Sequence, residues 1–255
     1  MKTVAIIQAR MGSTRLPNKV LADINGSPML ARVVRRVRQA RTLDQVVVAT
    51  STHPQDDAVE AFCTNEGVAC FRGSEDDVLD RYYGAARAVG ADVVVRISAD
   101  CPLHDPRVID AVVERFDAAR HDYVSNTIDR TYPDGLDTEV FSVGTLERAW
   151  RDAKWISERE HVTPYIWKQP ELFRIEQVTQ PVNLSALRWT VDEPRDLALV
   201  REVYRRLGDE FSMTDVATLL ARDDGLRSVN AGIPSNEGYE LSLQRDRMVE
   251  GEENR

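Results

Sequence analysis

Short apolar runs alternate with amphipathic stretches in the first half of the chain. The runs are rich in valine, isoleucine and alanine, and their nearly continuous apolar character is typical of strands buried on both faces of a parallel sheet. The strands expected from them cover residues 4–7, 46–49, 68–71 and 93–97. Between the runs, apolar residues recur at helical spacing, and the expected helices begin near Pro28, Pro54, Val78 and Pro106. This alternation predicts an α/β fold with a Rossmann-like, open, mostly parallel twisted sheet and helices on both faces.

The alternation stops after Ser125. Residues 126 to about 187 begin with a Pro/Gly turn and mix a short strand near 138–141 with helices around 145–152 and 158–167. Because strict βαβ spacing fails in this region, we expect an inserted β/α arm that leaves the main sheet.

The last third of the chain should return to the sheet. Residues 187–191 predict a final strand, and a helix over 195–207 should pack behind it. From Glu237 onward charged residues dominate, which predicts a frayed end. Since no repeat or low-complexity linker divides the chain, we expect one domain over residues 1–243 and a flexible tail over 244–255.

Charge and cysteine content exclude several classes of protein. The chain has 255 residues and a net charge of −9, which argues against a general binder of nucleic acid or acidic membranes. Its apolar runs are shorter than the roughly 18 residues of a membrane helix, and its start turns polar too early for a signal peptide, so we expect a cytoplasmic protein. The three cysteines lack C-x-x-C spacing, and neither a disulfide framework nor a zinc site is expected.

One segment departs from the acidic balance. Residues 1–22 contain four cations and no acidic residue. Three of these cations, Arg10, Arg15 and Lys19, fall in the stretch Q-A-R-M-G-S-T-R-L-P-N-K that follows the first expected strand. Open α/β sheets bind ligands at the carboxyl ends of their strands, so this loop predicts a bound anion.

The composition of the loop suits phosphate. Gly12 lets backbone amides approach a ligand closely, and Ser13 adds a hydroxyl donor. Arg10, Arg15 and Lys19 can neutralise several phosphate oxygens, although a solvated cationic loop is the alternative. The loop matches neither the P-loop pattern G-x-x-x-x-G-K-[ST] nor the dinucleotide pattern G-x-G-x-x-G.

The loop resembles the nucleotide loop, R-x-x-S-x-R-x-x-x-K, of sugar-acid cytidylyltransferases such as the CMP-ketodeoxyoctonate and CMP-acylneuraminate synthetases. It looks closest to the branch of spore coat polysaccharide biosynthesis proteins. The resemblance runs from residue 3 to about residue 243 and includes the stretches 72–82, 96–103 and 189–197 in order. It implies the fold of the nucleotide-diphospho-sugar transferases, CTP and an acidic small molecule as substrates, Mg²⁺ as cofactor, catalytic roles for Arg10, Arg15 and Lys19, and a homodimer formed through the 126–187 arm.

Two aspartates are candidate metal ligands. Asp100 follows the fourth expected strand and Asp192 follows the last one, so both should lie at the sheet edge that holds the cationic loop. Mg²⁺ favours one or two carboxylates together with substrate phosphates. The alternative for each is a turn or helix-capping role. In the resembling family this pair coordinates the catalytic metal.

A further set of residues is expected to contact the nucleotide. Gln8 follows a buried strand directly, where its amide could hydrogen-bond a base edge. The resemblance places Arg72, Ser74 and Arg81 near the base, ribose or incoming acid, while Arg81 has the alternative of pairing with Asp77 at i,i+4 spacing. The complete set is Gln8, Ala9, Gly12, Ser13, Arg72, Ser74 and Arg81.

The acceptor is expected near the turn that opens the irregular region. Gly135 belongs to this turn, and Asp137 and Glu139 lie two residues apart, on one face of any strand that follows. Facing carboxylates bind a polyol or an amine, or form an ordinary solvated edge. The resemblance places the acceptor pocket here. His161 is a further candidate acceptor-binding residue, for which a structural role is the alternative, and the resemblance places its stretch on the arm that packs against a partner subunit.

These observations predict a CTP- and Mg²⁺-dependent nucleotidyltransferase that activates a sugar acid or related acidic molecule and releases pyrophosphate. A glycosyltransferase that uses a nucleotide-sugar is a second reading, but a diphosphate donor does not call for so dense a cationic loop. A catalytically silent nucleotide-binding subunit is a third, against which the pair of aspartates argues.

Overall fold

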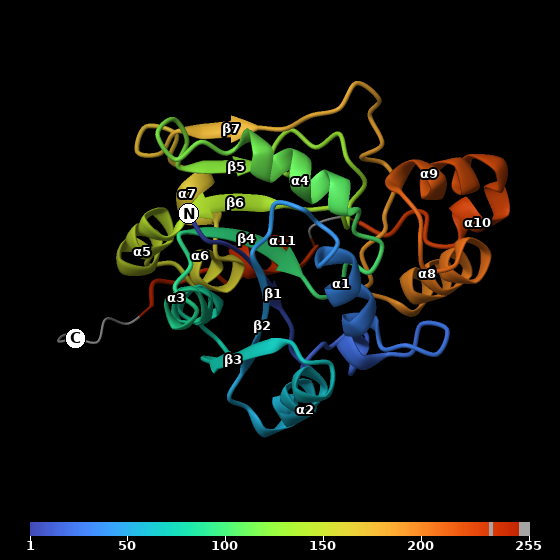
Figure 1. Ribbon diagram of the computed structural model, residues 1–255, viewed down its shortest axis with the longest axis horizontal. Coiled ribbons are helices and arrows are strands. Elements are labelled where there is room, and N and C mark those ends of the chain that lie inside the picture. The colour runs from blue at the N-terminus through green and yellow to red at the C-terminus, as the bar shows by residue number, and fades with distance from the viewer. Residues whose placement is uncertain (235–236, 250–255) are drawn as a thin grey trace.

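The chain folds around one mixed, seven-stranded sheet. In the computed structural model, which describes residues 1–234 and 237–249, the strand order is β3-β2-β1-β4-β6-β5-β7 (Figure 1). The strands are β1 Thr3–Gln8, β2 Gln45–Ser51, β3 Ala69–Gly73, β4 Val93–Ser98, β5 Tyr123–Ser125, β6 Glu139–Ser142 and β7 Ile175–Gln177. Strand β6 runs antiparallel to both of its neighbours, and the other four pairings are parallel. The predicted α/β fold with a mostly parallel sheet is confirmed.

Helices cover both faces of the sheet. They are η1 Lys19–Leu21, α1 Met29–Val37, η2 Pro54–Asp56, α2 Asp57–Asn65, α3 Val78–Ala88, α4 Pro106–Arg115, α5 Val143–Asp152, α6 Ile156–His161, α7 Pro164–Trp167, α8 Pro194–Leu207, α9 Met213–Arg222, α10 Asp224–Ser228 and α11 Glu237–Gln244. Among the residues that the structure describes, no helix is both long and apolar enough to cross a membrane.

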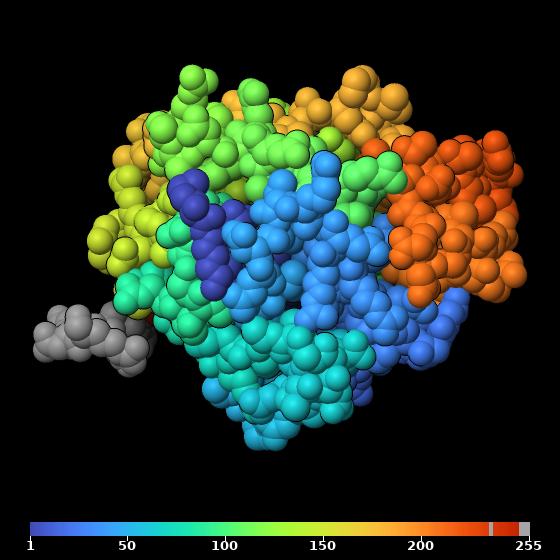
Figure 2. Space-filling view, in the orientation of Figure 1, coloured from blue at the N-terminus to red at the C-terminus, as the bar shows by residue number. Residues whose placement is uncertain are grey.

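Alternate residues of the central strand face opposite helical layers. Ala5 and Ile7 of β1 belong to the core formed with α1, α2 and α4, while Val4 and Ile6 belong to the core formed with α3 and α5. This period of two follows from the alternation of side chains along a strand, and it explains why the apolar run is continuous. A third core joins α8, α9 and α10 around the fully buried Trp189. These helices form an orange to red bulge on one side of the molecule (Figure 2).

The strand order places a ligand-binding crevice between β1 and β4. From β1 the chain adds β2 and β3 on one side and then crosses to add β4 on the other. In such sheets the loops leaving the two central strands diverge, which opens a crevice at their carboxyl ends. The cationic loop leaves β1 there, and the turn that carries Asp100 leaves β4 beside it.

The sequence predicts that residues 126–187 leave the main sheet, but part of this region belongs to it. Their strand β6 pairs with β4 and so continues the sheet, with α5, α6 and α7 packed beside it (Figure 1). Glu139 of β6 lies opposite Arg96 of β4 in the register, and the two side chains form a buried ion pair between the strands. The expected helix over 158–167 is also divided, because Val162 adopts a φ of 72° between α6 and α7.

The predicted strand over 187–191 is not part of the sheet. This segment instead joins the turn at Asp134 to the end of β4: Trp189 donates its backbone N–H to Asp134 (2.6 Å), and Val191 donates to Asp100 (2.8 Å). The segment is extended and apolar like a strand, but its backbone hydrogen bonds go to turns and not to a neighbouring strand. It still delivers Asp192 to the crevice.

The C-terminal region is more ordered than the expected frayed end. Residues from Glu237 form α11, and residues 246–249 pair with residues 154–157 next to α6. A frayed end is therefore wrong for residues 237–249. The remainder of the predicted tail, residues 250–255, lies outside the described residues.

Candidate active site

Lys19 connects the two predicted metal ligands. Its Nζ atom lies 2.8 Å from Oδ2 of Asp100 and 2.7 Å from Oδ1 of Asp192, and it also donates to the backbone carbonyl of Val191 at 3.0 Å. The short helix η1 holds Lys19 at this point, following Asn18 in a left-handed conformation. The structure thus brings Lys19, Asp100 and Asp192 together as the sequence predicts.

These ionic contacts perturb the acidity of the groups. Burial alone would raise the pKa of the Asp100 carboxyl, but its attraction to the Lys19 ammonium and the hydrogen bonds it accepts lower that pKa to about 2. Burial alone would lower the pKa of Lys19, but the two carboxylates raise it. The Asp100 carboxylate and the Lys19 ammonium are therefore both charged at neutral pH.

Asp192 is also held by arginines. Its Oδ2 atom accepts from Nη2 of Arg188 at 2.8 Å, and its Oδ1 atom lies 3.2 Å from Nη2 of Arg15. Asp196, one turn into α8, accepts from the backbone N–H groups of residues 192 and 193, each at 3.0 Å, and orients this corner. The turn is consequently preorganised before any ligand binds.

The backbone of the loop after β1 is anchored near its middle. The backbone N–H of Met11 donates to the carboxylate of Asp56 at 2.7 Å, and that carboxylate is itself held by Ser51 of β2. Asp56 is buried and was not expected to matter from the sequence. Its effect is to fix the middle of the loop while Gly12 and Thr14 stay exposed to the crevice.

A cavity of about 860 Å³ lies over this loop, and we name it the cationic cleft. Its charged lining consists of six cations and three carboxylates: Arg10, Arg15, Lys19, Arg81, Arg245 and Arg247 against Asp100, Glu160 and Asp192. Gln8, Ala9, Gly12 and Ser13 also line it, as predicted for the nucleotide. A net positive cleft in an acidic chain is suited to a polyanion.

Two buried polar atoms in this cleft lack an internal partner. Oε1 of Gln8 and Nε of Arg81 make no hydrogen bond within the described ranges. Arg81 is buried, which lowers the pKa of its guanidinium, and its Nη1 atom donates to the backbone carbonyl of Ser74 at 2.6 Å. Buried polar atoms are normally paired, so these two mark positions where a ligand can complete the hydrogen bonding.

Arg72 and Ser74 lie away from the lining of this cleft. The Arg72 guanidinium is turned toward α2, where it pairs with Asp57 at 2.7 Å and Glu60 at 2.8 Å. The Ser74 hydroxyl accepts from the backbone N–H of Asp77 at 3.0 Å. Their predicted contact with nucleotide stays a prediction that these positions do not support.

A second cavity of about 490 Å³ continues from the first, and we name it the acidic cleft. Its charged lining consists of four arginines and six carboxylates: Arg15, Arg96, Arg130 and Arg188 against Asp100, Asp134, Asp137, Glu139, Asp192 and Glu237. Gln8, His161 and the corner formed by Asp100 and Asp192 line both cavities. One continuous space therefore passes from a positive half, through the paired aspartates, to a negative half.

The predicted acceptor residues take different roles in the acidic cleft. Asp137 is about one-third exposed and accepts from both terminal nitrogens of Arg130. Glu139 is buried and ion-paired with Arg96, and its other oxygen accepts from Thr163 at 2.6 Å. Asp137 is thus open to a ligand, while Glu139 mainly orders the wall.

Gly135 supports the wall from behind. Its φ is 109°, and a Cβ atom there would lie 2.5 Å from the backbone nitrogen of Thr190 and 2.7 Å from the carbonyl carbon of Trp189. The two segments can approach this closely only because residue 135 has no side chain. Gly135 is therefore placed behind the cleft wall and acts through Thr190, which lines the cleft.

His161 lies at the junction of the two clefts. Its Nε2 atom is 3.0 Å from Oγ of Ser242 in α11, and burial lowers the pKa of the ring to about 4. Because the Ser242 hydroxyl donates its proton elsewhere, to Glu160 or Gly238, the neutral ring carries its hydrogen on Nε2.

Two carboxylates such as Asp100 and Asp192 are compatible with a Mg²⁺ site in which substrate phosphates supply the remaining oxygen ligands. Groups of three or more acidic, histidine or cysteine side chains that could hold a metal are not found among the described residues. Mg²⁺ needs only one or two carboxylates when substrate phosphates supply further oxygens. Asp100 and Asp192 both contact one ammonium, so the structure already places a cation between them.

Several site residues were missed by sequence reasoning. Arg188 lies four residues before Asp192, a spacing that signals a pair only within a helix, and here the chain is extended. Arg245 and Arg247 fall in a stretch that composition assigns to a frayed end. Arg96 pairs with Glu139, 43 residues along the chain, and Arg130 pairs with Asp137, 7 residues along, at a spacing that gives no direct pair within a helix or a strand.

Comparisons with known proteins identify the family of this chain. The chain is 37% identical over 236 residues to an uncharacterized protein of Methanocaldococcus jannaschii, covering 91% of this chain and 96% of that protein. It is 36% identical to the spore coat polysaccharide biosynthesis protein SpsF of Bacillus subtilis, covering 86% and 93% of the two chains. A solved cytidylyltransferase of Leptospira borgpetersenii superposes with a TM-score of 0.87 at 32% identity, covering 92% of this chain and 99% of that one. The model of the cytidylyltransferase family matches residues 4–206, and the chain therefore belongs to that family, as its loop motif predicts.

Proposed function

We propose that the protein transfers a cytidylyl group from CTP to a sugar acid or a related acidic small molecule, giving a CMP or CDP derivative and pyrophosphate. The observation that carries this proposal is the arrangement of Lys19, Asp100 and Asp192 at the junction of a cationic and an acidic cleft. Membership of the cytidylyltransferase family and similarity to SpsF support it.

In this proposal the triphosphate lies in the cationic cleft. Phosphate transfers depend on positioning and charge neutralisation rather than on a protein nucleophile. Lys19 and Arg10 would stabilise charge that develops on the α-phosphate, and Arg15 would stabilise the departing pyrophosphate. Gln8 offers an unpaired amide oxygen to a donor on the base.

Asp100 and Asp192 would hold Mg²⁺ in the active protein. The metal would supply further charge neutralisation on phosphate oxygens. Arg188 and Asp196 keep Asp192 oriented toward Lys19, so the carboxylate pair needs no rearrangement of the backbone to serve this role.

The acceptor would occupy the acidic cleft. A hydroxyl or phosphate oxygen of the acceptor, placed at the junction, would attack the α-phosphorus. The bond from this phosphorus to the oxygen that bridges the α- and β-phosphates breaks, pyrophosphate leaves with the electron pair, and the proton of an attacking hydroxyl passes to water. Asp137 is open to hydroxyl or amino groups, and Glu139 and Gly135 maintain the wall behind it. His161, neutral and at the junction, donates its Nε2 hydrogen to Ser242 and adds no charge to the site.

Ligand-dependent thermal unfolding tests the nucleotide. With Mg²⁺ and CTP at 100 times its Kd, the free energy of unfolding rises by about 2.7 kcal/mol, and each kcal/mol moves the midpoint by roughly 2–4 °C. We expect the shift with CTP, and a loss of it in Asp100→Asn but not in Asp224→Asn, whose side chain is exposed on α10. A shift only with UDP- or GDP-sugars would favour a glycosyltransferase.

Pyrophosphate release tests the reaction. We expect release from CTP only when a sugar acid or a phosphorylated or phosphonate acceptor is present. If CTP binds but no acceptor in such a panel gives pyrophosphate, the catalytically silent reading replaces the proposed one.

We also propose a homodimer, an expectation that rests on the family resemblance. Apolar side chains of the 126–187 region that remain substantially exposed are Ile128, Trp155, Leu172 and Val182. Sedimentation velocity at micromolar concentration tests this point, and a single monomer boundary would contradict it.

A further inference from the structure

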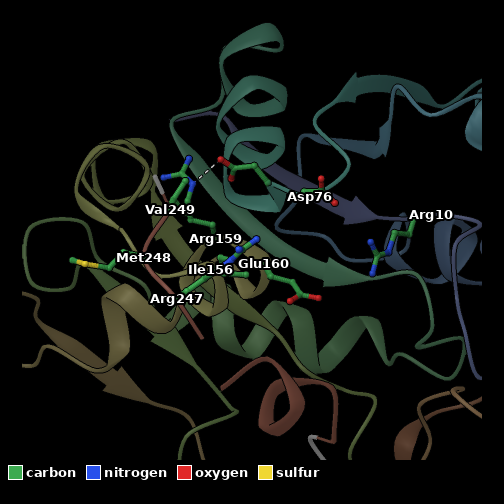
Figure 3. Close-up of a pocket in the computed structure, with 9 residues that line it drawn as sticks. Arg10, Asp76, Ile156, Arg159, Glu160, Arg247, Met248 and Val249 are labelled. Carbon is green, nitrogen blue, oxygen red and sulfur yellow. Dashed lines mark hydrogen bonds and ion pairs between the residues drawn. The ribbon is translucent and has the colours of Figure 1, made fainter. Parts of the chain in front are cut away.

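Two arginines near the C-terminus face the cationic loop across the cleft. Arg245 and Arg247 line the same cavity as Arg10, although they lie well beyond residues 4–206, the part of the chain that the family model matches. In Figure 3, Arg10 stands on one side of an adjoining cavity, Arg247 and Met248 stand on the other, and Glu160 of α6 lies between them. The C-terminal segment is therefore a wall of the cleft.

This wall is fixed by backbone pairing. The N–H of Ile156 donates to the carbonyl of Arg247 at 3.0 Å, and the N–H of Val249 donates to the carbonyl of Lys154 at 2.7 Å. The carboxylate of Asp246 accepts from both the backbone N–H and the hydroxyl of Ser157, at 3.0 and 2.7 Å. The segment that carries Arg247 is thus held in place without any contribution from the Arg247 side chain.

Helix α11 is fixed by a second group of contacts. The Ser242 hydroxyl lies 3.0 Å from Nε2 of His161 and donates to Oε2 of Glu160 at 2.8 Å. The rings of His161 and Tyr239 meet edge to face, with their centroids 4.9 Å apart. Since α11 docks on α6 by these contacts, Arg245 at its end is directed to the cleft by the fold.

Arg10 and the two C-terminal arginines lack ion-pair partners among the described residues, although Asp76 and Glu160 also line the adjoining cavity. The guanidinium groups of Arg10, Arg245 and Arg247 are exposed and form no hydrogen bond or ion pair with any described residue. The nearby carboxylate of Glu160 accepts from Ser242. Many other surface arginines have carboxylate partners, as Arg206 does in Glu202. In a chain of net charge −9, unpaired cations gathered at one cleft indicate a site for an external polyanion.

We propose that Arg245 and Arg247 are additional phosphate-binding residues, which hold the triphosphate from the side opposite the loop after β1. The C-terminal segment then completes the nucleotide site. This inference rests on the proposed function for the identity of the nucleotide. What it adds is a polyphosphate-binding site formed by both walls of the cleft.

The test measures binding of tripolyphosphate and of CTP by titration calorimetry in the full chain. Arg245→Ala and Arg247→Ala should each weaken both ligands about tenfold, the effect of losing one charge-assisted hydrogen bond. Arg247→Lys should recover part of the affinity, and binding should weaken as salt rises. The matched control is Arg227→Ala, whose side chain pairs with Asp224 on α10, outside both clefts.

Thermal unfolding without ligand separates binding from folding. Neither guanidinium has a partner among the described residues, so the unfolding midpoints of the two variants should equal that of the wild type. Unchanged affinity for tripolyphosphate in the double variant, or no binding of tripolyphosphate by the wild type, overturns the inference. Arginine-dependent binding of tripolyphosphate without binding of CTP supports it, and counts against CTP as the nucleotide instead.

Discussion

The carboxylate of Glu237 lies 2.6 Å from Nη1 of Arg15, although 222 residues separate them along the chain. The pair joins the first turn of α11 to the cationic loop at the border between the two clefts. Arg15 also contacts Asp192, so its guanidinium is shared between two carboxylates. A phosphate group that binds Arg15 therefore has to compete with Glu237.

Glu237→Gln should strengthen CTP binding. Removing the competing charge leaves Arg15 more available to phosphate, and because the pair is about one-third exposed, its contribution is at most about 1 kcal/mol. We expect the Kd for CTP to fall by about two- to fivefold in titration calorimetry. Glu240→Gln, exposed on the same helix, should leave the Kd unchanged. If both substitutions lowered the Kd for CTP equally, the tighter binding would come from the change in net charge and not from the release of Arg15.

Asp100 should make the free energy of unfolding depend on pH in the acid range. Its folded-state pKa of about 2 is below its ordinary value near 3.8, so its stabilising contribution is fully present above pH 4 and is lost as pH falls toward 2. Asp100→Asn should therefore lower the free energy of unfolding by about 2 kcal/mol at pH 7. Denaturant titrations should show this difference shrinking between pH 4 and pH 2. A difference that stays constant down to pH 2 would mean that the Lys19 contact does not lower the Asp100 pKa.

Gly135→Ala should destabilise the fold and disturb the acidic cleft. The added methyl group meets the backbone of residues 189 and 190 in a conformation that favours glycine. We expect a loss of about 2–3 kcal/mol, seen as a thermal midpoint lower by roughly 5–10 °C. Gly144→Ala in α5 is the control, because the nearest atom would be 3.7 Å away and alanine favours the helix. If Gly135→Ala kept wild-type stability but lost acceptor binding, Gly135 would contact the acceptor directly.

Much of the cationic cleft could be predicted from the sequence because it depends on the ends of strands. Parallel strands bring their carboxyl ends to one edge, so Lys19 and Asp100 meet there even though 81 residues separate them. Asp192 reached the same point by a different route. Its segment forms backbone bonds with the turn at Asp134 instead of a strand, and a sequence pattern does not distinguish these two extended states.

The remaining features depend on long-range polar contacts. The short strand near 138–141 was predicted, but its place beside β4 in the main sheet was not, because the pairing of Glu139 with Arg96 across the sheet is defined only by the register. The C-terminal wall was hidden because Asp246 and Arg247 dock through backbone groups and one serine, which leave no apolar periodicity. Arg72 of β3 pairs with Asp57 and Glu60 of α2 instead of lining the cationic cleft. This contact between a strand and a helix is not evident from the sequence pattern.

His161 should make the free energy of unfolding decrease as pH falls, although its own ring stays neutral near neutral pH. Its pKa is lowered to about 4 by burial, so between pH 6.5 and 4 the unfolded chain takes up a proton that the folded ring does not. The free energy of unfolding should therefore fall across this interval, and His161→Gln should reduce the fall by about 2 kcal/mol, after allowance for partial exposure. His104, whose pKa is also lowered by burial, is present in both proteins and cancels in the comparison. His121→Gln serves as the control, and titration of the ring proton resonances reports the protonation directly. A His161 midpoint near 6.5 would contradict this prediction, because the folded ring would then take up its proton over the same pH range as the unfolded chain.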